Sequence, residues 1–403
     1  MKRLAACVRG GLLLLSLMPV AGCAGLNRDP PAPRELSDQV TVLGIPNARF
    51  YPDTQGAALL REALDALARE RRAAGLPPGL TEGLPPADYL AISGGGDNGA
   101  FASGLLCGWQ DGGTIPSFKL VTGVSTGAMI APFAFLGQPY HDKLCSMYTT
   151  IKPSDILEPR GFYGALFSDA LADTTPLARL ISDYVTEQTL ADIAREYQKG
   201  RLLLIGTTNL DLQRPIIWNI GAIAASGNPG ALDLVRKILR ASAAIPGAFP
   251  PVMIDVEAGG RHYQEMDVDG GAVAQTFLYP PDLGVRVNLR ARENTRERRA
   301  YIIRNGRLDP DWAATDRQFL TIVQRAIDTM IHYSGYNDVL RIYATTQRDG
   351  VDYNLAYIEP DFPNTKHEEF EPAYLQALFD YGYARGRQGY KWHKTPPVLQ
   401  GKN

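Results

Sequence analysis

A serine between two glycines is the first feature of this sequence that could support catalysis. The segment GVSTG places Ser125 between Gly123 and Gly127, after the apolar run 118–122 and before the helical run AMIAPFAFL. A sharp turn from strand to helix needs glycines where the backbone approaches its neighbours, and it exposes the serine hydroxyl at the start of the helix. We therefore predict that Ser125 is a nucleophile. A helix-capping serine at an ordinary turn has the same local pattern and is the alternative.

A glycine-rich loop, SGGGDNGAF, precedes this serine. Successive glycines let several backbone N–H groups point into one concavity, which the oxyanion of a tetrahedral intermediate requires. We therefore predict that Gly94, Gly95 and Gly96 supply oxyanion donors. Gly99 completes the motif, and its spacing also fits a dinucleotide fingerprint. That alternative needs an acid about 20 residues later, where the sequence offers only Asp111 in the polar turn QDGGT.

An aspartate followed by two glycines is the third feature. Asp269, Gly270 and Gly271 follow the run HYQEMDV. A nucleophilic serine needs a base within hydrogen-bonding reach, and a carboxylate at the end of a strand can serve, so we predict Asp269 as the base. Considered by itself, Asp-Gly is equally a strong signal for a surface hairpin. Asp267 shares a strand face with Asp269 and is the alternative base.

The order of these three segments resembles that of the patatin-like phospholipases, from about Tyr89 to Val273. The stretch ASAAIPGAFPPV, residues 241–252, is similar to the segment before the aspartate in that family. The resemblance implies an α/β fold, namely a patatin-like three-layer α/β/α architecture with a mainly parallel central sheet. It also implies a lipid acyl hydrolase of the phospholipase A, lysophospholipase or esterase type that needs no cofactor.

The resemblance further implies a catalytic dyad without histidine. Ser125 attacks the ester carbonyl, Asp269 accepts its proton, and an acyl-enzyme is later hydrolysed. The glycines of the loop hold the oxyanion, and the amide of Thr126 adds a donor through the general geometry of such turns. One departure is Asn98, which stands where the family usually has Arg or Lys. This departure puts the rate and the substrate preference in doubt.

Two other functions remain open at this point. A Ser-His-Asp hydrolase shares the serine turn and places its histidine late in the chain, where the candidates are His332, His367 and His393. His262 precedes Asp269 and fits that chain order poorly. The second alternative is a binding lipoprotein on the same fold whose catalytic function has decayed.

The elements that must position these residues follow from hydrophobic periodicity. Short apolar runs at 89–93, 118–122 and 202–207 predict buried strands, and 353–359 predicts another. Helical spacing appears around Leu60, around Leu232 and Leu239, and from Phe319 to Met330, and Thr189 is predicted to cap a helix ending at 199. Alternating strands and helices imply a mainly parallel sheet covered on both faces.

The N-terminus predicts export and lipid anchoring. Residues 1–22 contain three basic side chains and the apolar run LLLLSLMPV, which is too short to span a bilayer but suits a signal peptide. The following VAGC resembles a bacterial lipobox, so Cys23 is the predicted lipidation site and membrane anchor. Ala24 is not the aspartate of an inner-membrane retention signal. We therefore expect a lipid-anchored protein of the bacterial cell envelope, at the outer membrane.

The remaining composition sets limits on partners and organisation. Removing residues 1–22 takes three of 41 basic side chains and none of the 43 acidic ones, and this acidic balance argues against nucleic-acid binding. Cys107 and Cys145 lie too far apart for a metal motif, and the sequence does not show whether they pair. No metal site and no oligomeric state are predicted. We expect four segments: signal peptide 1–22, tether and connector with one amphipathic helix 23–86, catalytic core 87–290, and C-terminal extension 291–403.

Overall fold

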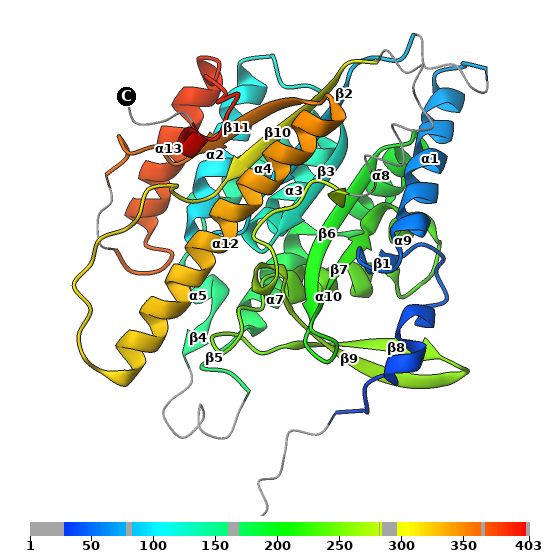
Figure 1. Ribbon diagram of the computed structural model, residues 1–403, viewed down its shortest axis with the longest axis horizontal. Coiled ribbons are helices and arrows are strands. Elements are labelled where there is room, and N and C mark those ends of the chain that lie inside the picture. The colour runs from blue at the N-terminus through cyan, green and yellow to red at the C-terminus, as the bar shows by residue number, and fades with distance from the viewer. Residues whose placement is uncertain are drawn as a thin grey trace, which may run out of the picture.

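The computed structural model describes residues 28–77, 83–159, 169–281, 283, 296–363 and 367–399, and its centre is a nine-stranded sheet (Figure 1). Five neighbouring strands run parallel. In sheet order they are β6 (Leu202–Asn209), β3 (Phe118–Val124), β2 (Ala87–Ile92), β10 (Arg298–Arg304) and β11 (Asp352–Tyr357). Every residue of β6 is buried, as expected for a strand with helices on both faces. All the strands predicted from the sequence are therefore present.

Antiparallel strands extend one side of the sheet. β7 (Arg214–Asn219) pairs with β6, and β1 (Arg49–Phe50) pairs with β7. β9 (Arg261–Asp269) reaches β6 only through its last three residues, and it forms a hairpin with β8 (Val252–Ala258). A separate two-stranded sheet joins β4 (Glu158–Pro159) and β5 (Ala172–Asp173). The end of β9 thus lies against the parallel strands while its hairpin projects away from them.

Helices cover both faces of the sheet and bury two separate hydrophobic clusters. The helices that contribute to the larger cluster are α2 (Gly99–Asp111), α3 (Thr126–Leu136), α4 (His141–Thr149), α5 (Pro153–Ile156), α7 (Thr175–Tyr184), α8 (Glu187–Gln198), α9 (Ile220–Ala225), α10 (Ala231–Ser242) and α13 (Pro372–Arg387). The smaller cluster lies under α1 (Gly56–Ala73) and the second half of α12 (Phe319–Asp349). The predicted three-layer α/β/α architecture with a mainly parallel sheet is confirmed.

Short 3₁₀ turns complete the element order. They are η1 (Arg34–Gln39), η2 (Gly96–Asn98), η3 (Gln138–Tyr140), η4 (Gly270–Ala272) and η5 (Pro397–Leu399). One local prediction is wrong: the cap of α8 is Thr186, whose side chain accepts from the N–H of Thr189, and Thr189 lies inside the first turn. The threonine three residues later bonds back to the cap, so both side chains satisfy helix-end groups.

Residues beyond 290 contribute strands to the central sheet. β10 pairs with β2 and β11 pairs with β10, both in parallel, so the sheet continues across the predicted boundary between core and C-terminal extension. The amphipathic helix expected in the connector is α1, which buries Leu59 and Leu60. The division of the chain into four segments stays a prediction. Cys23 and the signal peptide lie outside the described residues.

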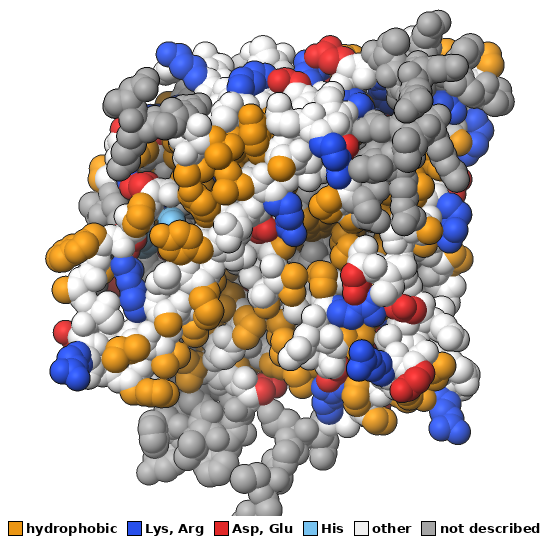
Figure 2. All heavy atoms as spheres, in the orientation of Figure 1, with side chains coloured by type: hydrophobic (Ala, Val, Ile, Leu, Met, Phe, Trp, Pro, Cys, Tyr) orange, Lys and Arg blue, Asp and Glu red, His pale blue; other side chains and the backbone are white. Residues whose placement is uncertain are grey.

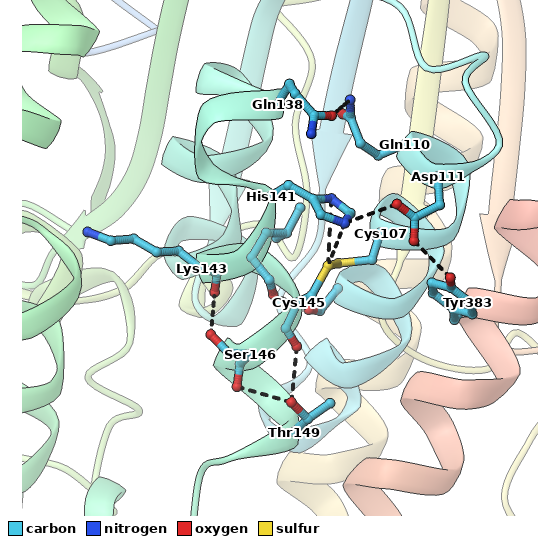
Figure 3. The surroundings of a disulfide bond; sticks show 12 residues. Cys107, Gln110, Asp111, Gln138, His141, Lys143, Cys145, Ser146, Thr149 and Tyr383 are labelled. Atoms are coloured by element: carbon cyan, nitrogen blue, oxygen red, sulfur yellow. Dashed lines mark hydrogen bonds and ion pairs between the residues drawn. A yellow bond between two sulfur atoms is a disulfide. The ribbon is translucent and has the colours of Figure 1, made fainter.

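A disulfide joins α2 to α4. Cys107 and Cys145, which the sequence left unassigned, are bonded, with their Cα atoms 5.8 Å apart (Figure 3). The two cysteines are 38 residues apart in the sequence. If the disulfide acts by lowering the entropy of the unfolded chain, closing a loop of this length contributes roughly 4 kcal/mol to stability. In the described part of the chain, no helix has the length and apolar character needed to cross a membrane.

Candidate active site

Ser125 lies at the junction of β3 and α3 in a strained backbone conformation. Its φ of 54° and ψ of −124° lie outside the regions that a residue with a side chain ordinarily adopts. The flanking glycines permit this turn. A Cβ on Gly123 would lie 2.4 Å from the carbonyl oxygen of Gly127, and one on Gly127 would lie 2.3 Å from that of Ile92. The GxSxG pattern is therefore a packing requirement of the strand-to-helix turn.

The Asp269 carboxylate lies beside this serine, at the last residue of β9. The Gly271 N–H donates to Asp269 Oδ1 over 2.7 Å, and the Ser125 side chain lies close enough to the carboxylate to lower its pKa. Burial raises the pKa of Asp269 to about 6. The interactions with Ser125 and with the Gly271 N–H oppose that shift, because both favour the ionised form. A Cβ on Gly270 would lie 2.6 Å from the carbonyl oxygen of Gly206, so the DGG turn is tightly packed against β6.

Asp267, the alternative base, faces different partners. Its Oδ2 accepts a hydrogen bond of 2.8 Å from the Thr207 hydroxyl, which in turn accepts from Trp218 Nε1. Burial, and then the charge of Glu265, raise the pKa of Asp267 to about 8. Neither Asp267 nor Asp269 is among the residues that line the cavity at Ser125, so the two differ in their partners and not in their place on the cavity wall. Of the two aspartates, Asp269 is the one whose pKa is affected by Ser125, so the choice of Asp269 as the base stays a prediction that this proximity favours.

The glycine loop supplies backbone donors, with one correction. Gly94 was predicted as an oxyanion donor, but its N–H donates to the Gln275 carbonyl over 2.8 Å and is therefore occupied. Within the described part of the chain, the N–H groups of Gly95, Gly96 and Thr126 have no acceptor. These three residues line the same cavity as Ser125, so they are the available donors. Gly99 is required by packing, because a Cβ there would lie 2.1 Å from Thr126 Oγ1.

Two residues that the sequence did not single out hold these segments together. Ser242 ends α10, and its hydroxyl accepts from the Ser125 N–H over 3.0 Å and donates to the Gly206 carbonyl over 2.7 Å. Ser242 lies within the stretch ASAAIPGAFPPV, so that segment contained the signal. Asn305 follows β10, donates through Nδ2 to the Ser93 carbonyl and accepts from the Ala102 N–H. Nothing local in the sequence marks Asn305.

A largely apolar cavity of about 220 Å³ opens at these groups. Its apolar wall comes from α3, α4, α7 and α10 and includes the buried side chains of Phe133, Leu177, Ile181 and Leu239. Among the described lining residues the charged side chains are Asp97 and Glu369, both acidic. Asn98, the departure from the family pattern, does not line the cavity, and its Oδ1 accepts from the Tyr374 hydroxyl over 2.6 Å. The cavity can hold an apolar chain with its reactive end at Ser125.

The histidines lie elsewhere. His262 faces Asp29 and Asp255 at 3.5 Å, His393 faces Glu359 at 3.3 Å, and His332 packs edge-on against Tyr333. His367 Nε2 lies 3.0 Å from Asp97 Oδ2, which places it near the cavity wall but not in it. None of the described cavity residues is a histidine. The histidine-based alternative therefore has no candidate in contact with the nucleophile among these residues.

The described residues include one grouping of metal-ligand type. Ligand atoms of Cys107, His141 and Cys145 lie within 4.8 Å of one another, and His141 also faces Asp111 at 3.1 Å (Figure 3). The two sulfur atoms are joined in the disulfide, so they are not available as thiolate ligands. This grouping is remote from the Ser125 cavity, which Cys107, His141 and Cys145 do not line.

Comparison with known proteins points to one family. The family model described as Patatin-like phospholipase matches residues 90–280. The chain is similar to the crystal structure of VipD from Legionella pneumophila, at 13% identity and a TM-score of 0.32, covering 76% of this chain and 67% of that chain. It is also similar to human GIVD cytosolic phospholipase A2, at 12% identity and a TM-score of 0.34, covering 82% of this chain and 56% of that one. Both TM-scores lie below 0.5, so neither likeness bears on function. No curated protein matches the chain.

Proposed function

Residues 90–280 belong to the patatin-like phospholipase family, and from this premise we propose that Ser125 and Asp269 form the catalytic dyad of a membrane-anchored lipid acyl hydrolase. That the chain is a patatin-like lipid hydrolase follows from the family. The observation that supports the dyad is that Asp269, a buried aspartate whose pKa is about 6, lies close enough to Ser125 for the serine side chain to lower that pKa. A carboxyl with this pKa is ionised at neutral pH, yet it is more basic than an exposed aspartate.

In the proposed reaction, Ser125 Oγ attacks the ester carbonyl carbon as its proton passes to Asp269. The bond from carbonyl carbon to alcohol oxygen then breaks, and the leaving alcohol takes the proton from Asp269. Water attacks the acyl-serine and gives a proton to Asp269, which returns it to Ser125 as the fatty acid leaves. Gly95, Gly96 and Thr126 line the cavity, and among the described residues their N–H groups have no acceptor, so we expect them to bind the oxyanion, where one donor typically contributes about 10²- to 10³-fold in rate.

The cavity supports an acyl ester as substrate. Its buried wall is formed by Phe133, Leu177, Ile181 and Leu239, which suit a hydrocarbon chain, while the polar groups gather near Ser125. This arrangement of an apolar pocket with a few convergent polar groups is the usual form of a small-molecule site. We expect the acyl chain in the pocket and the alcohol portion toward the solvent.

The anchoring is part of the proposal. A lipid on Cys23 would hold the enzyme at the bacterial outer membrane and raise its effective concentration at a lipid substrate. Metabolic labelling with an alkynyl palmitate tests this directly. The wild-type chain should be labelled and recovered with outer membranes, and Cys23→Ser should be unlabelled. An unlabelled wild-type chain would overturn the anchor and leave the hydrolase unaffected.

The test of the dyad is hydrolysis of p-nitrophenyl butyrate and of a phospholipid, with labelling by a fluorophosphonate. Ser125→Ala and Asp269→Asn should both fall to background, and Ser125→Ala should not be labelled. Asp65→Asn is the matched control, because Asp65 is an exposed aspartate on α1, which packs on the other face of the sheet. Activity that survives Asp269→Asn but is lost in His367→Gln would favour the histidine-based alternative. A silent, unlabelled wild-type protein would favour a binding lipoprotein.

A further inference from the structure

The first half of α12 carries apolar side chains that face solvent. Of the thirteen large hydrophobic residues that are exposed in the described chain, seven lie between residues 312 and 333. They are Trp312, Phe319, Ile322, Val323, Met330, Ile331 and Tyr333. Figure 2 shows hydrophobic side chains along the lower left, over this part of α12. Such a concentration marks an interaction site more often than scattered single exposures do.

The exposed side chains follow helical periodicity. Phe319, Ile322, Val323, Met330 and Tyr333, together with exposed Ala326, occur at spacings of three, four, seven, eleven and fourteen residues from the first of them, which places them on one stripe. The side that faces the protein is different. It carries Gly335, Asp338, Val339 and Ile342, all of them buried. The stripe therefore points away from the body and is 78% exposed at Phe319 and 64% exposed at Met330.

The first half of α12 is next to the mouth of the Ser125 cavity. Glu369 lines the cavity and is exposed, so it marks the open end. Asp328, which lies on α12 within the span of the stripe, is close enough to contribute to the raised pKa of Glu369, after burial and Asp97. α12 therefore lies beside the entrance to the cavity, with Asp328 on the side toward the cavity and the stripe on the opposite side of the helix.

The N-terminal attachment approaches the same end of the molecule. Arg28, the first described residue, is held by Asp211 and by the Gln264 carbonyl on β9. In Figure 1 the chain enters at the lower end, toward which the first half of α12 also extends. Arg28 is five positions after Cys23 in the sequence, a reach of about 17 Å at most. A lipid on Cys23 would keep this end of the protein at the bilayer.

We propose that the first half of α12 is an interfacial helix that inserts its apolar stripe into the surface of the lipid bilayer and so keeps the enzyme close to membrane lipids. This inference rests on the proposed lipid hydrolase and its Cys23 anchor. A helix with one strongly apolar side lies in the plane of the interface, with that side in the boundary between headgroups and acyl chains. The occupant is thus a lipid surface.

Trp312 offers a direct test, because it is 88% exposed while Trp109 and Trp218 are buried. With vesicles of phosphatidylcholine and phosphatidylglycerol that contain brominated acyl chains, the fluorescence of the mature chain from residue 24 onward should be quenched. Trp312→Phe should lose most of that quenching. Equal fluorescence with and without brominated lipid would overturn the proposal.

The second test compares two substrates in each variant. Phe319→Ser, Ile322→Ser and Met330→Ser combined should lower hydrolysis of vesicle phospholipid at least tenfold relative to hydrolysis of p-nitrophenyl butyrate. The matched control combines Leu210→Ser and Val398→Ser, two exposed apolar residues outside the stripe, and should leave that ratio within twofold. An unchanged ratio in the stripe variant would overturn the proposal, as would sedimentation showing that a second copy covers the stripe. A wild-type chain inactive on both substrates would instead refute the hydrolase.

Discussion

Two aspartates on the same face of β9 have opposite protonation at neutral pH. Asp267 and Asp269 are two residues apart and both buried, at 0% and 5% exposed. Burial raises both pKa values, to about 8 for Asp267 and about 6 for Asp269. The difference lies in their partners. The Ser125 side chain and the Gly271 N–H, which donates to Asp269, favour the charged form of Asp269, whereas the charge of Glu265 disfavours ionisation of Asp267.

This comparison shows that burial alone does not make a base. At pH 7 the Asp269 carboxyl is mostly ionised and can accept a proton, while the Asp267 carboxyl is mostly protonated. Backbone hydrogen bonds at the end of α10 position both residues of the proposed dyad. The Ser242 hydroxyl accepts from the Ser125 N–H, and the Ala244 carbonyl accepts from the Asp269 N–H over 2.9 Å.

The largest expected effect is the difference in activity between a variant of Asp269 and the same variant of Asp267. Asp269→Asn removes the proton acceptor and should lower kcat/KM for p-nitrophenyl butyrate by about 10³-fold or more. Asp267→Asn should change kcat/KM by less than about threefold, because in the proposed reaction Asp267 neither accepts nor donates a proton. Steady-state kinetics of the two variants side by side measure the difference. Equal losses would mean that Asp267 acts in the reaction as well.

The next effect concerns the residue that positions the serine turn. Ser242→Ala leaves the buried N–H of Ser125 without its acceptor, so we expect kcat to fall by roughly 10- to 100-fold, about 1–3 kcal/mol. KM should change little, because Ser242 does not line the cavity. Ser242→Thr retains the hydroxyl and should recover most of kcat. A loss confined to KM would contradict a positioning role.

The pH dependence tests the lower pKa of the pair. Because Asp269 accepts a proton only when ionised, kcat/KM should rise with pH through a midpoint at about 6 and become flat above pH 7. Below the midpoint the rate should fall about tenfold per pH unit. Stopped assays from pH 4.5 to 8 give the profile. A midpoint near 4 would mean that burial does not shift Asp269.

The last effect is on stability and tests the pKa of Asp267. The folded chain keeps a proton on Asp267 that the unfolded chain releases above pH 4, so the free energy of unfolding decreases from this group as pH rises toward 8. An asparagine at position 267 cannot ionise, so the free energy of unfolding of Asp267→Asn does not decrease with pH in this way. Relative to wild type, the variant should gain up to about 4 kcal/mol between pH 5 and pH 8, and its Tm should rise by several degrees relative to that of wild type. Thermal unfolding at the two pH values measures it, and a parallel shift at both would contradict the prediction.

Local patterns predicted most of the fold and part of the site. The apolar runs at β2, β3 and β6 and the glycine turns after them were readable because strand burial and tight turns depend on residues adjacent in sequence. The same holds for GVSTG, where both glycines prove to be packing requirements. Gly94 was assigned wrongly, since the carbonyl that occupies its N–H belongs to Gln275, far along the chain.

The sequence by itself determined the alternation of strands and helices, the strained turn at Ser125 and the glycine-rich donors, because these depend on steric limits within a few residues. Tertiary structure decided what depends on distant partners. It gave Asp267 and Asp269 different partners, joined Cys107 to Cys145, brought in Asn305 and Ser242 to position the loops, and turned the apolar stripe of α12 outward. Burial and hydrogen-bond partners come from residues that meet only when the sheet and its helices pack together.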